Sequence, residues 1–414
     1  MGAASFSVGT AVNCRRMVSF KAHFSRFLAA DPERLHFAAH SHHYWPDVSL
    51  EGQQRAWEWA AEHADAKWGP IFEQILPAAQ GHVARMLGLP DPSTIAFAPN
   101  THELLVRIAS SIEAPHREGR PLRILATDAE FHSFERQSRR WEEAGQAVVE
   151  RVPAAPFETL PARLQARAAA GEHDLVFFSQ VHFNSGYVLE DLAAIVDAVP
   201  SADVPVIVDG YHGFAALPVD LSSIADRAFY MSGGYKYAMA GEGCCFAHCP
   251  PGFGRRPVNT GWFAGFGALE DGVGERVAYA DDGMRLMGAT FDPSALFRLD
   301  AVWSHFQREG IDVAAIHAHV VQLQQRLLDA VAQAPIGPLS PETLLPGPSF
   351  GTRGHFLTFE IEEAGAIHDR LREAKVWTDY RGARLRFGFA AYHDDEDVET
   401  LIERLQSVLG QAQG

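Results

Sequence analysis

Short apolar runs alternate with amphipathic stretches along much of the chain. From about Leu50 to Leu87 apolar residues recur at helical spacing, which predicts two helices with a break at Gly69-Pro70. Six later runs rich in β-branched residues predict strands: Arg123–Thr127, Ala147–Val152, Leu175–Ser179, Val204–Val208, Ala228–Met231 and Gly243–Phe246. Strands that alternate with helices in this way indicate an α/β fold, with a mostly parallel central sheet and helices on both faces.

A second pattern begins near residue 293. One long helical segment is predicted from Pro293 to Ala332. The rest of the chain alternates strand and helix, at Phe356–Ile361, Ala364–Ala374, Leu385–Phe389 and Asp395–Leu409. We therefore expect a large domain over residues 51–297 and a small α+β domain over residues 298–414. Residues 21–50 are expected to pack near the functional site and the small domain, and residues 1–20 to form a disordered extension.

Composition and charge limit the kinds of partner. Hydrophobic residues make up 47% of the 414 positions and charged residues 21%, which is ordinary for a soluble globular protein. The formal net charge of -17 disfavours binding to nucleic acid or to an anionic membrane surface, since both require basic surface. No stretch approaches the roughly 20 apolar residues that cross a bilayer. A small-molecule ligand is therefore expected.

The cysteines favour a reducing compartment. The chain has four, and Cys244, Cys245 and Cys249 cluster on one predicted strand, where they are expected to pack and not to form a disulfide framework. Arg15 and Arg16 follow the first mildly apolar segment, whereas a secretory signal places its basic residues in front. We expect a cytoplasmic protein.

Lys236 and Asp209 are the most informative residues. Lys236 follows an apolar strand and a Ser-Gly-Gly turn, and a tyrosine flanks it on each side, which does not suit a solvated lysine. Asp209 ends another apolar strand. A buried lysine amine can form a Schiff base with an aldehyde, and a carboxylate can keep a pyridine nitrogen protonated. The pair therefore predicts pyridoxal 5'-phosphate (PLP) as the cofactor, with both residues catalytic.

Other candidate residues fall where predicted strands end, which is where ligands bind in such sheets. His212 shares a turn with the predicted acid and can reach a neighbouring ring oxygen, and Ser179 ends another strand. Asn100 and Thr101 begin a helix whose hydroxyl and free N–H groups can hold a phosphate. Phe131 offers an aromatic face to a pyridine ring.

Four neighbouring histidines do not indicate a metal site. They are His36, His40, His42 and His43, and they lie in one extended segment with no cysteine and only Asp47 as a nearby acid. We expect no bound metal.

These residues together resemble the fold-type I, class V aminotransferase superfamily, and within it kynureninase most closely. The similarity extends over most of the chain from Phe37 onward. The segment Tyr235–Tyr237, followed by Gly241 and Gly243, is similar to the kynureninase lysine motif. The resemblance implies the fold-type I PLP-dependent transferase fold, Lys236 as the Schiff-base residue and Tyr235 as a ligand of the cofactor phosphate.

Further segments extend the resemblance to the cofactor contacts and to the assembly. It implies additional cofactor contacts at Asn100, Thr101, Ser179, Asp209, His212 and Thr290. Gly261-Trp262-Phe263 resembles a segment with which kynureninases bring a tryptophan to the cofactor phosphate of the opposite subunit. The match at Trp262 implies a homodimer with shared active sites.

The C-terminal part resembles the small domain of the same family. The matching segments are Arg353-Gly354, Asp379-Tyr380-Arg381 and Leu385-Arg386-Phe387. By this resemblance Arg386 would bind the α-carboxylate of an amino-acid substrate, for which a guanidinium group is a natural partner.

Two departures affect the substrate site. Where kynureninases begin with a Gly-Asn-Ser-Leu-Gly-like segment, this chain reads Ala39-His40-Ser41-His42-His43, so His40 and Ser41 become candidate substrate contacts. Phe131 lies one position from the stacking aromatic residue of kynureninases and closer to the stacking histidine of cysteine desulfurases. The resemblance therefore implies the cofactor without fixing the substrate.

The resemblance implies a lyase that cleaves the Cβ–Cγ bond of a kynurenine-type substrate by hydrolysis, giving alanine and an aromatic acid. Transamination, epimerisation and β-elimination on another amino acid remain alternatives that use the same cofactor. Desulfuration is disfavoured, because the region 337–358, where desulfurases of this superfamily carry their persulfide cysteine, has no cysteine. A more distant alternative is a non-catalytic homologue that binds a metabolite.

Overall fold

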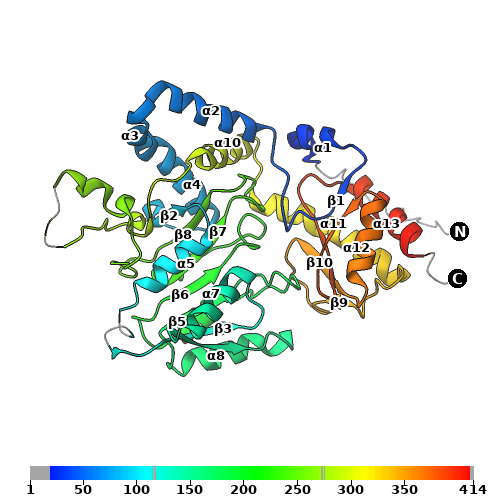
Figure 1. The fold of residues 1–414 in the computed structure, drawn as a ribbon. Coiled ribbons are helices and arrows are strands. Elements are labelled where there is room, and N and C mark those ends of the chain that lie inside the picture. The colour runs from blue at the N-terminus through cyan, green and yellow to red at the C-terminus, as the bar shows by residue number, and fades with distance from the viewer. Residues whose placement is uncertain (1–18, 114, 116–117, 272–273, 275, 411–414) are drawn as a thin grey trace, which may run out of the picture.

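The computed structural model describes residues 19–410, except 114, 116–117, 272–273 and 275. Most of the expected N-terminal extension, residues 1–18, lies outside the described residues. A large part built on a seven-stranded sheet lies beside a small part built on a four-stranded sheet (Figure 1). No helix of the described residues is long and apolar enough to cross a bilayer.

The large sheet has the strand order β2-β8-β7-β6-β5-β3-β4. Its strands are β2 (Ile95–Ala98), β3 (Leu122–Thr127), β4 (Ala147–Val152), β5 (Leu175–Ser179), β6 (Val206–Asp209), β7 (Ala228–Gly233) and β8 (Cys245–His248). Only β8 runs against its neighbours, and the other strands share one direction. The prediction of an α/β fold with a mostly parallel sheet is confirmed.

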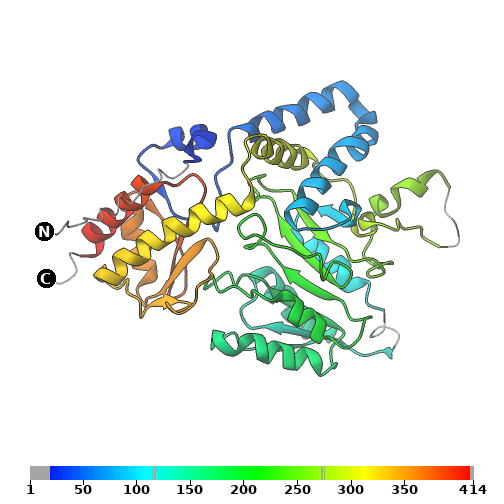
Figure 2. The same cartoon turned by 180° about the vertical axis from the view of Figure 1, so that it is seen from behind.

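Helices flank this sheet. They are α2 (Val48–His63), α3 (Trp68–Pro70), α4 (Leu76–Met86), α5 (Thr101–Ser110), α7 (His132–Glu143), α8 (Leu160–Ala169), α9 (Leu192–Ala198) and α10 (Ser294–Arg308). α5 packs on β2, β7 and β8, whereas α7 and α8 pack on the opposite end of the sheet, at β3 and β4. α2, α4 and α10 pack together beyond the β2 end (Figures 1 and 2).

The break expected at Gly69-Pro70 is absent, so this prediction is wrong. Helical structure continues from Trp68 to Met86, through a π-helical stretch at Ile71–Ile75. Pro70 is tolerated because it stands in the first turn, where a backbone N–H has no acceptor within the helix. The chain turns instead at Ala64, which has a φ of 48°.

The helical segment expected from Pro293 to Ala332 is divided. α10 ends at Arg308, and α11 (Val313–Gln333) begins after a turn in which Gly310 has a φ of 69°. α10 packs on α2 and α4 and contributes to the large hydrophobic core. The domain boundary expected between residues 297 and 298 therefore falls inside a helix of the large part.

The small part has its own core. Its sheet has the order β12-β13-β10-β9, with β9 (Leu344–Leu345), β10 (Phe356–Glu360), β12 (Asp379–Arg381) and β13 (Arg384–Gly388). α11, α12 (Ala364–Glu373) and α13 (Asp395–Leu409) cover it, and α11 reaches from this sheet toward the large part (Figure 2). The second core joins these helices and strands, with Leu357, Phe387 and Leu405 fully buried.

The N-terminal segment connects the two parts. After α1 (Ser25–Ala30), β1 (Leu35–His36) pairs in parallel with β11 (Val376–Trp377) of the small part. The chain then packs closely against Gly388: a Cβ added to this glycine would lie 2.2 Å from Nδ1 of His40. The backbone N–H of His43 donates to the carbonyl of Tyr235 at 3.3 Å. Residues 35–43 thus run from the small core to the turn that carries Lys236.

Candidate active site

A cavity of about 470 Å³ lies at the carboxyl ends of β5, β6 and β7. Eight residues expected from the sequence line it: Asn100, Thr101, Phe131, Ser179, Asp209, His212, Tyr235 and Lys236. They come from separate elements, so the fold brings a lysine, a carboxylate, an aromatic ring and a helix N-terminus to one cavity.

Lys236 is buried, with 5% of its surface exposed, and its Nζ lies 2.6 Å from Nε2 of His212. Burial lowers the pKa of the Lys236 amine from 10.5 to about 7; the charge of Asp209 opposes this change. Burial also lowers the pKa of His212 well below its ordinary value, so this imidazole is neutral at pH 7. Much of the Lys236 amine is therefore unprotonated near neutral pH and can act as a nucleophile or a base.

The turn before Lys236 requires small residues. A Cβ added to Gly233 would lie 2.1 Å from Oη of Tyr211, and one added to Gly234 would lie 2.7 Å from the carbonyl oxygen of Gly241. Both distances are too short for a side chain, so the Ser-Gly-Gly sequence follows from the close packing at the end of β7.

Asp209 ends β6 directly beside Ser179, its Cα partner at the end of β5. Its Oδ1 accepts a hydrogen bond from the backbone N–H of Tyr211 at 2.9 Å. Burial raises the pKa of Asp209, and the Tyr211 N–H and the charge of Lys236 oppose the rise. A protonated ring nitrogen in the cavity would stabilise the ionised carboxylate further.

The N-terminus of α5 faces the same cavity. The side chain of Asn100 caps the helix, since Oδ1 accepts the backbone N–H of Glu103 at 2.9 Å. Thr101 and His102 form the first turn and line the cavity. The N–H groups of a first turn lack acceptors within the helix, so they can bind an anion here.

Aromatic rings surround the amine of Lys236. The ring centroids of Tyr211, Phe131 and Tyr235 lie 5.2, 5.5 and 5.7 Å from Nζ. Tyr235 also stacks on His42, with the ring centroids 5.3 Å apart. These rings exclude water from the amine, in agreement with its lowered pKa.

Tyr211 and Glu130 were not singled out from the sequence, and Cys245 was predicted only to pack. Tyr211 places its hydroxyl 3.2 Å from Sγ of Cys245, which also lines the cavity. Burial raises the pKa of the Cys245 thiol to about 11. Of the clustered cysteines only Cys245 lies on β8. It packs in the strand and also lines the cavity. Glu130 lies behind the cavity wall. The only feature of the sequence that could have pointed to it is its position directly before Phe131, a predicted cofactor contact.

Arg386, His40 and Ser41 lie outside the cavity lining. Arg386 is 3% exposed and donates from Nη2 to Oδ2 of Asp379 at 2.6 Å. His40 is buried against Phe356, with Nε2 3.8 Å from the same carboxylate oxygen. Ser41 contacts His42 instead. Arg386 is nevertheless close enough for its charge to lower the pKa of Lys236.

Trp262 and Thr290 also lie outside the lining. Nε1 of Trp262 donates to Oγ1 of Thr290 at 3.2 Å, and the Trp262 side chain is 41% exposed. The residues around 255–271 project from the large part at the left of Figure 1. Within one chain, neither residue reaches the cavity that holds Lys236.

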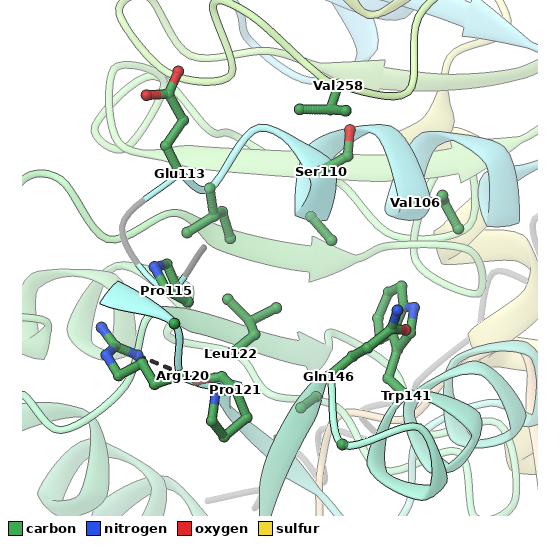
Figure 3. Close-up of a pocket in the computed structure, with 15 residues that line it drawn as sticks. Val106, Ser110, Glu113, Pro115, Arg120, Pro121, Leu122, Trp141, Gln146 and Val258 are labelled. Atoms are coloured by element: carbon green, nitrogen blue, oxygen red, sulfur yellow. Dashed lines mark hydrogen bonds between the residues drawn. The ribbon is translucent and has the colours of Figure 1, made fainter. Parts of the chain in front are cut away.

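A larger cavity, of about 730 Å³, lies elsewhere (Figure 3). It is mostly apolar and lies between the end of α5, at Val106 and Ser110, and the start of β3, at Leu122, with Trp141 on a further side. It contains none of the candidate residues predicted from the sequence. The smaller cavity is the better candidate, since converging polar groups with altered pKa values mark a site more specifically than size does.

Two family profiles match this chain. The profile of the family described as aminotransferase class-V matches residues 54–343. The chain belongs to the class V aminotransferase family. A second profile, described as the kynureninase C-terminal domain, matches residues 316–405. The resemblance to a kynureninase-like class V member is thereby confirmed.

Solved structures of a cystine C–S lyase and of cysteine desulfurases share the fold. The cystine C–S lyase C-DES, in complex with its product cysteine persulfide, has a TM-score of 0.74 and 20% identity, over 92% of this chain and 99% of that chain. The cysteine desulfurase of Thermococcus onnurineus NA1 has a TM-score of 0.75 and 16% identity, over 92% and 95%. The cysteine desulfurase CsdA of Escherichia coli has a TM-score of 0.75 and 18% identity, over 94% of this chain and 98% of that chain. No curated protein matches the sequence significantly.

Class V aminotransferases use PLP, so the chain is a PLP-dependent enzyme. The side chains of the cavity fit this cofactor. Lys236 would supply the amine, Asp209 a carboxylate for the ring nitrogen, Phe131 an aromatic face, and the first turn of α5, at Thr101, N–H groups for the phosphate.

Proposed function

We propose that this class V enzyme is a lyase of kynureninase type, which hydrolyses the Cβ–Cγ bond of a kynurenine-type amino acid to give alanine and an aromatic acid. The observation that supports this most is the match of residues 316–405 to the kynureninase C-terminal domain. That segment carries Arg386, whose charge acts on the Lys236 amine.

The cavity residues have separate roles around the substrate α-carbon. When bound, PLP supplies an aldehyde that takes up the substrate amine and a ring that withdraws electrons. Asp209 would accept a hydrogen bond from the ring nitrogen and so keep that nitrogen protonated. Lys236 removes and returns the proton at the α-carbon, since an amine with a pKa of about 7 is suited to both steps. His212 stays neutral and fixes the direction of Nζ.

Arg386 is proposed to bind the α-carboxylate of the substrate. Its Nη2 contacts Asp379, and Nη1 contacts the carbonyl of Phe183. Its Nε is buried and has no hydrogen-bond partner among residues 19–410 that the structure describes. Asp379 also binds Arg381 at 2.7 Å, so two guanidinium groups share one carboxylate and leave a net positive charge for the substrate. The unpaired Nε is the donor left for the substrate carboxylate.

The remaining walls suit an aromatic substrate side chain with polar groups. Phe183 lines the cavity and packs edge-on against Phe131, with ring centroids 5.2 Å apart. Neither ring nitrogen of His40 has a hydrogen-bond partner among the described residues, although the side chain is buried. We propose His40 and Ser41 as contacts of the substrate side chain.

The proposed assembly is a cytoplasmic homodimer with shared sites. Trp262 is exposed and lies outside the cavity of its own chain, as does its partner Thr290. Val258, on the same projecting segment, and Val277 are 78% and 61% exposed. An exposed apolar segment of this kind suits a subunit interface, and it would carry Trp262 to the phosphate end of the partner's cavity.

The reaction can be tested by product analysis. The holoenzyme is incubated with kynurenine, 3-hydroxykynurenine and a panel of other amino acids including cystine, with and without a keto-acid acceptor; Lys236→Ala is the control. Alanine released from a kynurenine without acceptor supports the proposal. Turnover that needs the acceptor indicates an aminotransferase, and pyruvate from cystine indicates a β-eliminating lyase. Either result, with no cleavage of kynurenine, rejects the kynureninase reaction.

A further inference from the structure

Glu130 is a buried acid directly behind the cavity. It lies in the turn between β3 and α7, is 5% exposed and does not line the cavity. Its two carboxylate oxygens each accept a hydroxyl proton, Oε1 from Thr127 and Oε2 from Ser179, both at 2.5 Å. Among the ion pairs of the described residues, none includes Glu130. The backbone N–H groups of Thr127 and Ser179 also contact the carboxylate. A buried acid held by neutral donors and by no cation needs an explanation, because burial disfavours its charge.

Ser179 connects this acid to the cofactor cavity. Its hydroxyl donates backward to Glu130, while the residue itself lines the cavity and stands beside Asp209 on the next strand. A hydroxyl has one proton and two lone pairs. When Glu130 is ionised, the Ser179 hydroxyl donates its hydrogen bond to the carboxylate. Ser179 can then offer only lone pairs to a ligand in the cavity.

Protonation of Glu130 reverses this arrangement. The acid O–H then needs an acceptor, and the hydroxyl oxygen of Ser179 is in place at 2.5 Å. The proton of Ser179 is released and can turn toward the cavity or toward Asp209. The alternative acceptor, Oγ1 of Thr127, already receives the backbone N–H of Ala129 at 3.3 Å and has one lone pair left, whereas the Ser179 hydroxyl oxygen accepts no hydrogen bond among the described residues and is the better acceptor. When Glu130 takes up a proton, the Ser179 hydroxyl therefore becomes a hydrogen-bond donor at the cavity wall.

The charges around Glu130 allow this change near neutral pH. Burial raises the pKa of Glu130 to about 7; the hydrogen bonds from Ser179 and Thr127 oppose the rise, and the charge of Asp209 adds to it. Asp209, on β6, is the titratable group that faces Glu130, and β3 and β5 present the two hydroxyl groups and the Ser179 backbone N–H. The neighbouring charge of Asp209 therefore disfavours ionisation of Glu130.

We propose that Glu130 is a positioning residue for the cofactor: its protonation state decides whether Ser179 presents a hydrogen or only lone pairs to the PLP ring. This inference rests on PLP binding in the cavity and not on which reaction follows. Its failure would leave the product analysis above unchanged, and a failed product analysis would leave it intact.

The holoenzyme without substrate provides the test. The absorbance of bound PLP is titrated from about pH 5.5 to 8.5 in the wild type and in Glu130→Gln, Ser179→Ala, Thr127→Val and the matched control Thr127→Ser. We expect a one-proton step near pH 7 in the wild type and in Thr127→Ser, and no step in Glu130→Gln or Ser179→Ala. Thr127→Val should keep the step but raise its midpoint by about one pH unit, because the carboxylate loses one hydroxyl donor while Ser179 remains.

Infrared difference spectra separate this role from a purely structural one. The carbonyl band of a protonated carboxyl should titrate near pH 7 in the wild type and in Ser179→Ala, and should be absent in Glu130→Gln. Absence of a step in the wild type, or the same step in Glu130→Gln, overturns the proposal. If Glu130→Gln does not retain PLP, the other two variants decide. The proposal is then overturned if the absorbance step persists in Ser179→Ala, or if Thr127→Val leaves the midpoint unchanged.

Discussion

The lowered pKa of Lys236 leads to a quantitative prediction for the apoprotein. An amine with the ordinary pKa of 10.5 is about 0.1% unprotonated at pH 7.5, whereas one with a pKa of about 7 is roughly three-quarters unprotonated. The shift corresponds to about 5 kcal/mol between the two protonation states. Burial is its main cause, so it should persist when the cofactor is removed.

The assay is competitive labelling of amines as a function of pH, read by mass spectrometry of each lysine peptide. The chain contains only four lysines, Lys21, Lys67, Lys236 and Lys375, so each can be followed separately. The labelling midpoint of Lys236 should lie near pH 7. Lys21 is the internal control, because its contacts with Asp394 and Asp397, both at 2.9 Å, help to raise its pKa. The midpoint reports the protonation equilibrium even if burial slows the reagent.

A variant tests the cause of the shift. Asp209 is the group whose charge opposes the effect of burial, so Asp209→Asn should lower the Lys236 midpoint further, by about one pH unit. A Lys236 midpoint that coincides with that of Lys21, or one that rises in Asp209→Asn, would refute the reasoning.

Three further predictions concern the substrate, the assembly and stability. Arg386→Lys should raise KM with the PLP absorbance intact, because an ammonium group cannot reproduce the guanidinium contacts; loss of the absorbance would mean that Arg386 is misassigned. Mixing inactive Lys236→Ala and Trp262→Ala subunits should restore PLP retention and activity, since a mixed dimer has one complete site; no recovery would reject the shared site. For the apoprotein, Lys236→Met should exceed the wild type in free energy of unfolding at pH 7. Urea titrations should show this excess falling by about 3.5 kcal/mol between pH 7 and pH 10. The unfolded chain binds a proton at Lys236 that the folded chain releases; an excess independent of pH would contradict this.

Much of the fold was readable from local sequence. The sheet strands are short, apolar and bounded by polar turns, and β4 and β5 lie where the pattern predicted them. The order of the strands places the ends of β5, β6 and β7 together, which is why Ser179, Asp209 and Lys236 meet. The turn at Ala64 was not readable, because a positive φ at a non-glycine residue leaves no signal in composition.

The hidden parts of the site depend on contacts between distant segments. Glu130 reads as a turn acid until β3 and β5 are placed side by side and both of its oxygens are seen to be occupied. Arg386 was expected to face a substrate, but its pairing with Asp379 requires the register of β12 on β13. Such second-layer pairs are set by tertiary packing and carry no motif of their own.

The central claim is that Lys236 is the residue that carries PLP. It is tested most directly by borohydride reduction of the yellow holoenzyme, followed by mapping of the modified peptide. We predict that the colour disappears on reduction and that the cofactor mass is found on Lys236 alone, with neither feature in Lys236→Ala. Cofactor mass on Lys21, Lys67 or Lys375, or a holoenzyme that reduction leaves unlabelled, would contradict the account.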